Sequence, residues 1–115
     1  VRKTEDAARL TPAQLTQGLD VEKPLLVLDH QPRELAELEE AGADLVLSGH
    51  THDGQLWPFT LLIHSYWENP CGILRKGTMT SLVTSGAGVW GPNMRVGTRS
   101  EVVEIHLTFS GNPSL

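Results

Sequence analysis

The sequence predicts an α/β fold built on two parallel strands joined by a helix. Residues 25–28 and 45–47 are short apolar runs bounded by polar and turn-forming residues, a pattern typical of strands buried on both faces. Residues 32–42, which lie between them, have the pattern of a helix. Two neighbouring parallel strands must be joined by a crossover connection of about a dozen residues or more, which is usually a helix. We therefore expect a strand–helix–strand unit.

The helix predicted between the two strands has recognisable signals at both ends. Pro32 suits a first helical turn, and Glu34 adds a favourable negative charge near it. Leu35 and Leu38 form an apolar stripe that can face a core. Gly42 is placed to end the helix in the left-handed conformation.

Three histidines follow the two predicted strands. His30 comes after the first strand, and His50 and His52 follow Gly49 after the second. The carboxyl ends of parallel strands lie at one edge of a sheet, where ligands and catalytic groups gather. Imidazole suits zinc, iron and manganese, whereas magnesium and calcium prefer oxygen. The sequence therefore predicts a shared metal site at this edge.

The rest of the chain predicts a hairpin, a terminal strand and an apolar segment. Residues 72–85 contain two β-prone runs about a Lys-Gly turn. Residues 101–109 alternate between apolar and mostly polar side chains, which predicts a strand with one buried face. Residues 56–67 are too short to span a bilayer and contain no lysine or arginine. We expect them to cover the core edge or make an oligomer contact, with membrane-surface binding as an alternative.

Residues 86–91 match G-x-G-x-x-G, the fingerprint of dinucleotide-binding proteins. That fingerprint must open a helix, yet Pro92, Asn93 and Gly97 follow at once. We therefore interpret these glycines as a tight loop whose backbone can approach a ligand closely.

Composition narrows the classes of function. The chain has 115 residues, a net charge of -5 and no cluster of basic residues, so nucleic acid is not expected as a general partner. Its single cysteine, Cys71, excludes an intrachain disulfide and is expected to be a small buried or half-buried residue. His106 falls on the polar face of the last strand and is expected to be solvated, and His64 has no partner at ligand spacing.

At this point the sequence resembles the calcineurin-like metallophosphoesterases, in particular the bacterial membrane-associated or cell-surface branch that carries G-H-T-H-x-G-Q-x-W-P. The residues that carry the resemblance are 28–32, 49–58 and 84–92, together with Arg95, Ser100 and Glu101. The resemblance implies the C-terminal half of a four-layer α/β/β/α sandwich, with residues 1–115 forming the C-terminal part of one phosphoesterase domain.

The resemblance also implies a hydrolase of phosphate mono- or diesters that uses two divalent ions of Mn, Zn or Fe. His30 and His50 would bind one ion and His52 the other. Asp29 and Asp53 are candidates for orienting the imidazole rings, or are ordinary loop residues. Arg95 could reach a substrate phosphate or form an ion pair with a nearby acid.

The family's D-x-H, G-D-x-x-D and G-N-H-D/E motifs do not occur in this sequence. We therefore expect it to be the C-terminal portion of a longer enzyme that is inactive alone. Because one sheet face would be uncovered, we expect this portion to pair with itself, to associate with its missing half or to be only marginally stable. The alternative is a non-catalytic interaction module or structural zinc site, in which Cys71 is the only available thiol. A membrane-edge adaptor built on residues 56–67 is a third hypothesis.

Overall fold

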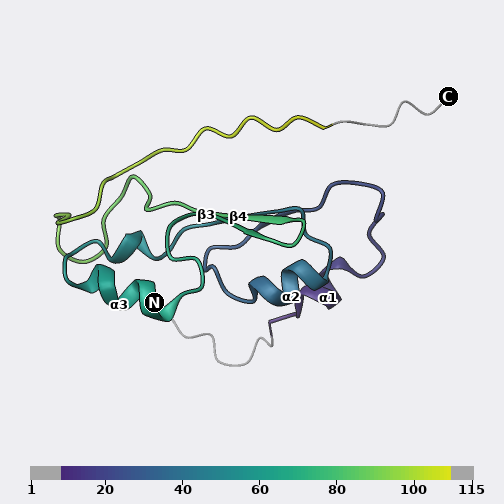
Figure 1. The fold of residues 1–115 in the computed structure, drawn as a ribbon, viewed down its shortest axis with the longest axis horizontal. Coiled ribbons are helices and arrows are strands. Elements are labelled where there is room, and N and C mark those ends of the chain that lie inside the picture. The colour runs from purple at the N-terminus through teal and green to yellow at the C-terminus, as the bar shows by residue number, and fades with distance from the viewer. Residues whose placement is uncertain (1–8, 110–115) are drawn as a thin grey trace.

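A computed structural model of the chain describes residues 9–109, and Figure 1 shows their arrangement. The elements in chain order are α1 (Pro12–Thr16), β1 (Leu26–Leu28), α2 (Leu35–Glu40), β2 (Leu45–Ser48), the short 3₁₀ turn η1 (His52–Gly54), α3 (Phe59–Tyr66), β3 (Gly72–Lys76) and β4 (Met79–Val83).

The four strands form one mixed sheet in the order β1-β2-β4-β3. Strands β1 and β2 are parallel, as are β2 and β4, whereas β3 and β4 pair antiparallel. The predicted parallel unit and the predicted hairpin are both confirmed. The carboxyl ends of β1 and β2 therefore lie side by side, which places the residues after Leu28 and Ser48 at one edge.

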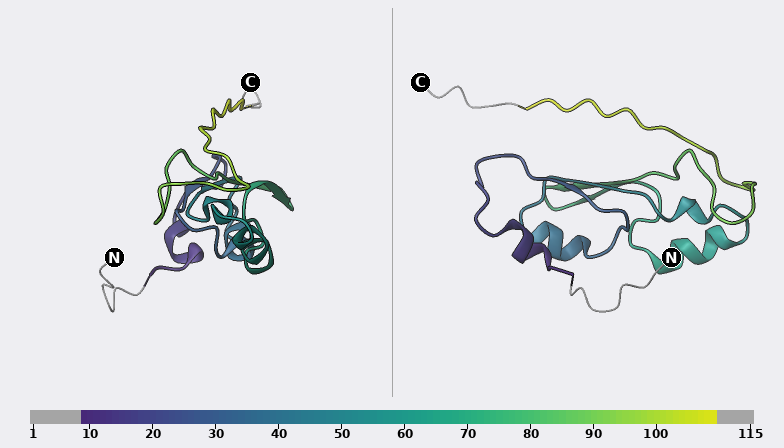
Figure 2. Two further views of the ribbon diagram at one scale, coloured as in Figure 1. Left: turned by 90° about the vertical axis from the view of Figure 1, so that its left-hand side faces the viewer. Right: turned by 180° about the vertical axis from the view of Figure 1, so that it is seen from behind.

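The helices lie on one face of the sheet (Figures 1 and 2). Alternation along β2 turns Val46 toward them, where it is fully buried beside Met79 of β4. Leu35 and Leu38 of α2, together with Ala43, complete this core. The apolar stripe predicted for α2 is confirmed.

The start predicted for α2, at Pro32, was wrong, whereas the end predicted at Gly42 was right. The helix begins at Leu35 and not at Pro32, because Glu34 adopts a left-handed conformation (φ 54°) that interrupts helical geometry. Pro32 is instead buried in the loop before the helix. Gly42 has a φ of 85° and ends the segment as expected.

The opposite face of the sheet carries an apolar row that crosses all four strands. Leu28 pairs with Leu47, Leu47 with Leu82, and Leu82 with Ile73. The prediction that residues 25–28 are buried on both faces was wrong at Leu28, which is 81% exposed, and Ile73 at the other end of the row is 69% exposed. No helix within residues 9–109 covers it, and the four-layer sandwich stays a prediction.

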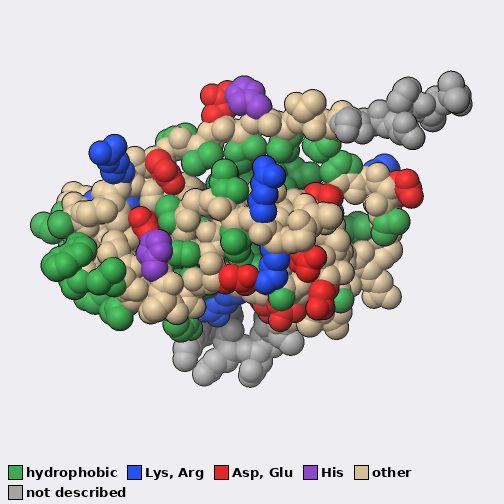
Figure 3. All heavy atoms as spheres, in the orientation of Figure 1, with side chains coloured by type: hydrophobic (Ala, Val, Ile, Leu, Met, Phe, Trp, Pro, Cys, Tyr) green, Lys and Arg blue, Asp and Glu red, His purple; other side chains and the backbone are tan. Residues whose placement is uncertain are grey.

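The terminal strand predicted over residues 101–109 was wrong. The segment is extended but pairs with no strand among the described residues, and it runs above the uncovered sheet face (Figure 2). Its pattern survives in part, because Val102 is far more exposed than Val103 and Ile105. Those two side chains, with Leu28, Leu47 and Leu82 of the apolar row, line a hollow of about 550 Å³. Figure 3 shows hydrophobic side chains gathered beneath the segment.

Helix α3 leaves most of its apolar side chains in solvent. Exposed large side chains at this end of the molecule include Trp57, Phe59, Leu61, Leu62, Tyr66, Val89, Trp90 and Val96. They do not cover the core edge as expected for residues 56–67, because α3 packs mainly on the η1 turn. Within residues 9–109, none of the helices combines the length and the apolar character needed to span a bilayer.

Candidate metal centre

Two of the three predicted ligands meet at the carboxyl edge of the parallel strands. His30 follows β1 and His50 follows β2, and the Gly49 amide donates to the His30 carbonyl at 3.2 Å. His30 Nε2 lies 3.0 Å from His50 Nδ1. The topology predicted from the sequence thus brings these imidazoles into contact across 20 residues of chain.

This separation fits two ligands of one metal ion. Nitrogens about 2.0–2.1 Å from a zinc ion, with an angle at the metal between a right angle and the tetrahedral value, are about 2.8–3.4 Å apart. Burial lowers the pKa of His50, and the neighbouring charges of His30, Arg33 and His52 lower it further. Neutral imidazole is the form that binds metals.

Side chains beside the pair hold the His50 ring in place. Gln31 Nε2 lies 3.3 Å from His50 Nε2, so the ring's other nitrogen is turned to His30. The Trp67 ring packs edge-on to His50 with centroids 6.2 Å apart, and the Arg33 guanidinium lies over Trp67. Sequence reasoning noticed Gln31 only as part of the family resemblance, and it assigned no role at the site to Trp67 or Arg33.

His52 does not join the pair. Its Nδ1 lies 3.4 Å from Arg95 Nη2, and its carbonyl accepts a hydrogen bond from Arg95 Nη1 at 3.1 Å. Within the described part of the chain, no group of three or more His, Cys, Asp or Glu side chains converges as a metal ion requires. The residues present therefore fit two ligands of one ion, and the rest of a coordination shell is not among them.

The loop that carries His50 and His52 has an unusual backbone. His50, His52, Asp53 and Gln55 all have φ between 50° and 66°, in the left-handed region that side chains other than glycine seldom adopt. Such conformations persist when the surroundings fix them. Here Thr51 helps, because its hydroxyl donates to the Pro70 carbonyl at 2.6 Å and accepts from the Asp53 amide.

Gln55 is the second anchor of this loop. Its side chain is buried, donates to the carbonyls of Trp90 and Pro92 at 2.6 and 3.1 Å, and accepts from the Trp90 amide at 2.5 Å. The main chain adds a further contact, since the Val96 amide donates to the Gln55 carbonyl. The glycine-containing loop is thus fastened to the histidine loop, and among the described residues no helix follows residues 86–91, as predicted.

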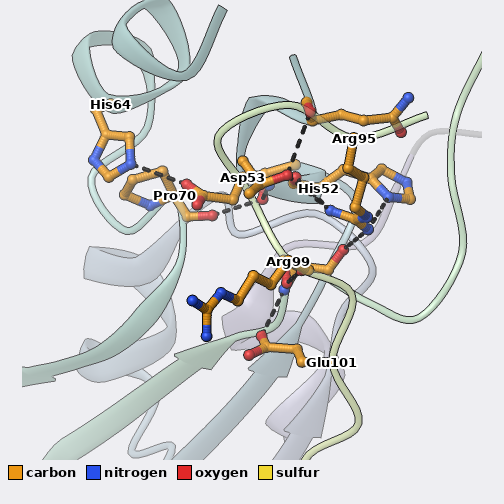
Figure 4. A network of polar contacts seen from close by, with 11 residues as sticks. His52, Asp53, His64, Pro70, Arg95, Arg99 and Glu101 are labelled. Carbon is orange, nitrogen blue, oxygen red and sulfur yellow. Dashed lines mark hydrogen bonds and ion pairs between the residues drawn. The ribbon is translucent and has the colours of Figure 1, made fainter. Parts of the chain in front are cut away.

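Arg95 lies between these two loops, as Figure 4 shows. Besides its contacts with His52, Nη2 donates toward the carbonyls of Ser85, Gly86 and Gly88 at 2.6, 3.1 and 2.6 Å. Nη1 also reaches Thr98 Oγ1 at 3.3 Å. Among the described residues its partners are neutral acceptors, and no carboxylate pairs with it.

The two candidate orienting carboxylates contact other partners. Asp29 pairs with Arg9 and accepts from the Gln31 amide. Asp53 Oδ1 lies 3.0 Å from His64 Nε2, which gives His64 the partner that sequence spacing did not suggest (Figure 4). His106 is solvated as expected, with an exposed side chain 2.9 Å from Glu104.

Glu101 was noticed only as part of the family resemblance, but it has a clear structural role. Its carboxylate accepts from the Ser85 amide and the Thr84 hydroxyl, both at 2.9 Å. These hydrogen bonds to the charged form hold the pKa of Glu101 below its ordinary value. The contacts secure the start of the extended segment to the end of β4.

Cys71 is half-buried, as predicted. Burial raises the pKa of its thiol, and the carboxylates of Asp53 and Glu101 raise it further. Because the thiolate is the form that binds metals, this environment disfavours Cys71 as a ligand.

Comparison with known proteins identifies the class. The chain is 41% identical over 96 residues to an uncharacterized metallophosphoesterase of Campylobacter jejuni, and the match covers 83% of this chain and 26% of that protein. It is 42% identical over 90 residues to an uncharacterized metallophosphoesterase of Helicobacter pylori, covering 76% of this chain and 24% of the relative. A transmembrane protein with metallophosphoesterase domain from Danio rerio is 41% identical over 104 residues, and the match covers 78% of this chain and 23% of the relative.

This chain is therefore related to the metallophosphoesterases, and the resemblance seen in its motifs is confirmed. It spans about a quarter of the length of these curated relatives. No family model matches the chain. No solved structure matches it either.

Proposed function

We propose that this chain supplies histidine ligands to the dinuclear metal centre of a phosphate ester hydrolase. His30 and His50 would hold one divalent ion and His52 the other, with Mn, Zn or Fe as the metals that suit imidazole. The observation that carries the proposal is the 3.0 Å contact between His30 Nε2 and His50 Nδ1. The relatives support it because they are named metallophosphoesterases.

The ligands and their neighbours each have a defined part in this proposal. His30 and His50 offer two nitrogens at ligand spacing, and Gln31 turns the His50 ring toward His30. The lowered pKa of His50 keeps its ring neutral over a wider pH range. When bound, divalent cations stabilise charge on the phosphoryl oxygens and acidify water.

The 115-residue chain is proposed to be inactive alone. Catalysis of this kind uses two cations about 3.5–4 Å apart. Within residues 9–109, only two imidazoles converge, and no carboxylate joins them. Activity therefore requires ligands from outside this range.

Metal stoichiometry tests the proposal directly. Mn²⁺ and Zn²⁺ binding is measured by calorimetry on the chain and on a His50→Ala, His52→Ala double variant. We expect about one ion or fewer per chain, lost in the double variant. Equal binding by the variant would overturn the assignment, and two ions per chain would point to ligands supplied by a second copy.

A structural zinc site is the alternative, and Cys71 distinguishes it. A structural site normally closes with four ligands, and Cys71 is the only thiol. The raised pKa of this thiol argues against it. Zinc binding by a Cys71→Ala variant decides between them, since only a Cys-His site would lose its metal.

Contact with a membrane surface is a second candidate property of the same region. The exposed aromatic and aliphatic side chains of residues 57–66 favour it, because Trp and Tyr gather at membrane interfaces. Vesicle co-sedimentation with a Leu61→Lys, Leu62→Lys variant tests it. Retention of binding in that variant would exclude α3 as the contact.

A further inference from the structure

Arg95 occupies a position between the glycine-containing loop and His52. Three carbonyl oxygens of one loop, those of Ser85, Gly86 and Gly88, converge on its Nη2 at 2.6–3.1 Å. Converging carbonyl dipoles repel one another unless a cation lies among them, and a guanidinium carries a permanent charge. Arg95 therefore supplies the charge that allows this loop to close.

The same guanidinium reaches across to His52. Nη1 donates to the His52 carbonyl at 3.1 Å, and Nη2 lies 3.4 Å from His52 Nδ1 (Figure 4). His52 needs such support because its backbone is left-handed, with φ at 50°. Both the main chain and the ring of His52 are thus tied to one side chain 43 positions away.

These contacts leave Arg95 little capacity for a ligand. Its Nη1 and Nη2 face protein acceptors, and its Nε is buried without a partner in the described residues. A guanidinium that binds phosphate presents two parallel donors to it. The donors here are directed into the two loops instead.

We propose that Arg95 is a positioning residue for His52, fixing the main chain and the ring orientation of the second histidine of the G-H-T-H motif. The proposal rests on the proposed function, in which His52 is a ligand. Arg95 acts through His52 and the loop carbonyls and makes no contact with substrate. A guanidinium is required for the full set of contacts, because Nη1 donates to the His52 carbonyl while Nη2 contacts the carbonyls of the other loop.

The test uses the three site histidines as separate probes. Side-chain ¹⁵N resonances of His30, His50 and His52 are recorded without metal in mildly alkaline buffer. The samples are the wild-type chain, Arg95→Met and Arg95→Lys, with Arg99→Met as a matched control. Arg99 is exposed, and its side chain has no hydrogen bond or ion pair within residues 9–109.

A guanidinium donating toward Nδ1 favours the tautomer that carries its proton on Nε2. In Arg95→Met we expect the two His52 nitrogens to shift toward the average of the two tautomers, while the His30 and His50 resonances stay in place. Arg95→Lys should also shift the His52 resonances, because one ammonium cannot take the places of both Nη1 and Nη2. Arg99→Met should leave all three histidines unchanged.

Two results would overturn the proposal. Unchanged His52 resonances in both Arg95 variants would show that the contact does not position the ring. Equal changes at all three histidines would show that Arg95 supports the fold as a whole. A Zn²⁺ titration of the wild-type chain tests the proposed function separately. If Zn²⁺ shifts no histidine resonance, the proposed metal site is wrong, whereas the metal-free spectra still decide the Arg95 proposal.

Discussion

Gly54 is expected to be the position where adding one methyl group does most damage to the histidine loop. It has a φ of 74°, and a Cβ placed there would lie 2.6 Å from both the backbone nitrogen and the Cα of Thr60. Those atoms belong to the first turn of α3 and cannot move without shifting the helix. The loop and α3 therefore approach this closely only because residue 54 is glycine.

The magnitude of the effect follows from two contributions. A side chain in the left-handed region costs about 1–2 kcal/mol. Overpacking against a fixed backbone adds about 1–3 kcal/mol. We expect Gly54→Ala to lower the free energy of unfolding by about 2–5 kcal/mol.

Gly42→Ala is the matched control, because Gly42 also has a positive φ, 85°, but has no atom within 4 Å of the place that a Cβ would take. Gly42→Ala should lower the free energy of unfolding only by the conformational contribution, about 1–2 kcal/mol. Urea unfolding followed by tryptophan fluorescence measures both variants. With a slope of about 1–3 kcal/mol/M, a difference of about 2 kcal/mol separates the midpoints by roughly 0.7–2 M. Equal midpoints would refute the steric argument.

Three further predictions concern the pH dependence, the core and the uncovered sheet face. The pKa of Glu101 is lowered on folding, so its contribution to stability is present above its ordinary pKa of 4.5 and is lost as the pH falls through the lower folded value; Glu101→Gln should flatten acid unfolding there. Met79→Ala removes a fully buried side chain and should cost about 2–5 kcal/mol in urea unfolding. The chain should self-associate in sedimentation velocity, and Leu28→Glu with Ile73→Glu should shift it to monomer.

Each of these has a result that contradicts it. An acid-unfolding curve identical in Glu101→Gln would show that the hydrogen bonds from Ser85 and Thr84 do not favour the charged form. Met94 is 56% exposed, so Met94→Ala should change stability by less than about 0.5 kcal/mol. If Met94→Ala lowered the free energy of unfolding as much as Met79→Ala does, the assignment of Met79 to the core would be contradicted. A monodisperse wild-type monomer would contradict self-association through the apolar row.

Local pattern was enough to predict the framework of the fold and the two histidines that meet. The apolar runs before His30 and His50, with a helix between them, require parallel strands, and parallel strands place their carboxyl ends together. The hairpin followed from β-prone runs about a Lys-Gly turn, and the stripe of Leu35 and Leu38 followed from helical spacing. These features depend on interactions between residues near in sequence or on a rule of topology.

Predictions from the sequence were wrong where the hydrophobic pattern of a segment does not match its surroundings in the fold. Residues 101–109 alternate as a strand does, but alternation records which side chains prefer burial and cannot supply a hydrogen-bonding neighbour. No strand pairs with them among the described residues. For the same reason the apolar run of residues 25–28 predicted burial on both faces, although Leu28 is exposed in the structure.

By itself, the sequence determined the parallel strand–helix–strand unit, the meeting of His30 with His50, and the relationship to the metallophosphoesterases through the G-H-T-H motif. Only the tertiary structure decided the partners of the remaining site residues: Arg95 with His52, Asp53 with His64, and Glu101 with the end of β4. Two of these contacts join positions 43 and 11 residues apart through irregular loops. No periodicity records such contacts, because the path of an irregular loop is fixed by backbone angles and long-range hydrogen bonds rather than by repeating side-chain preference.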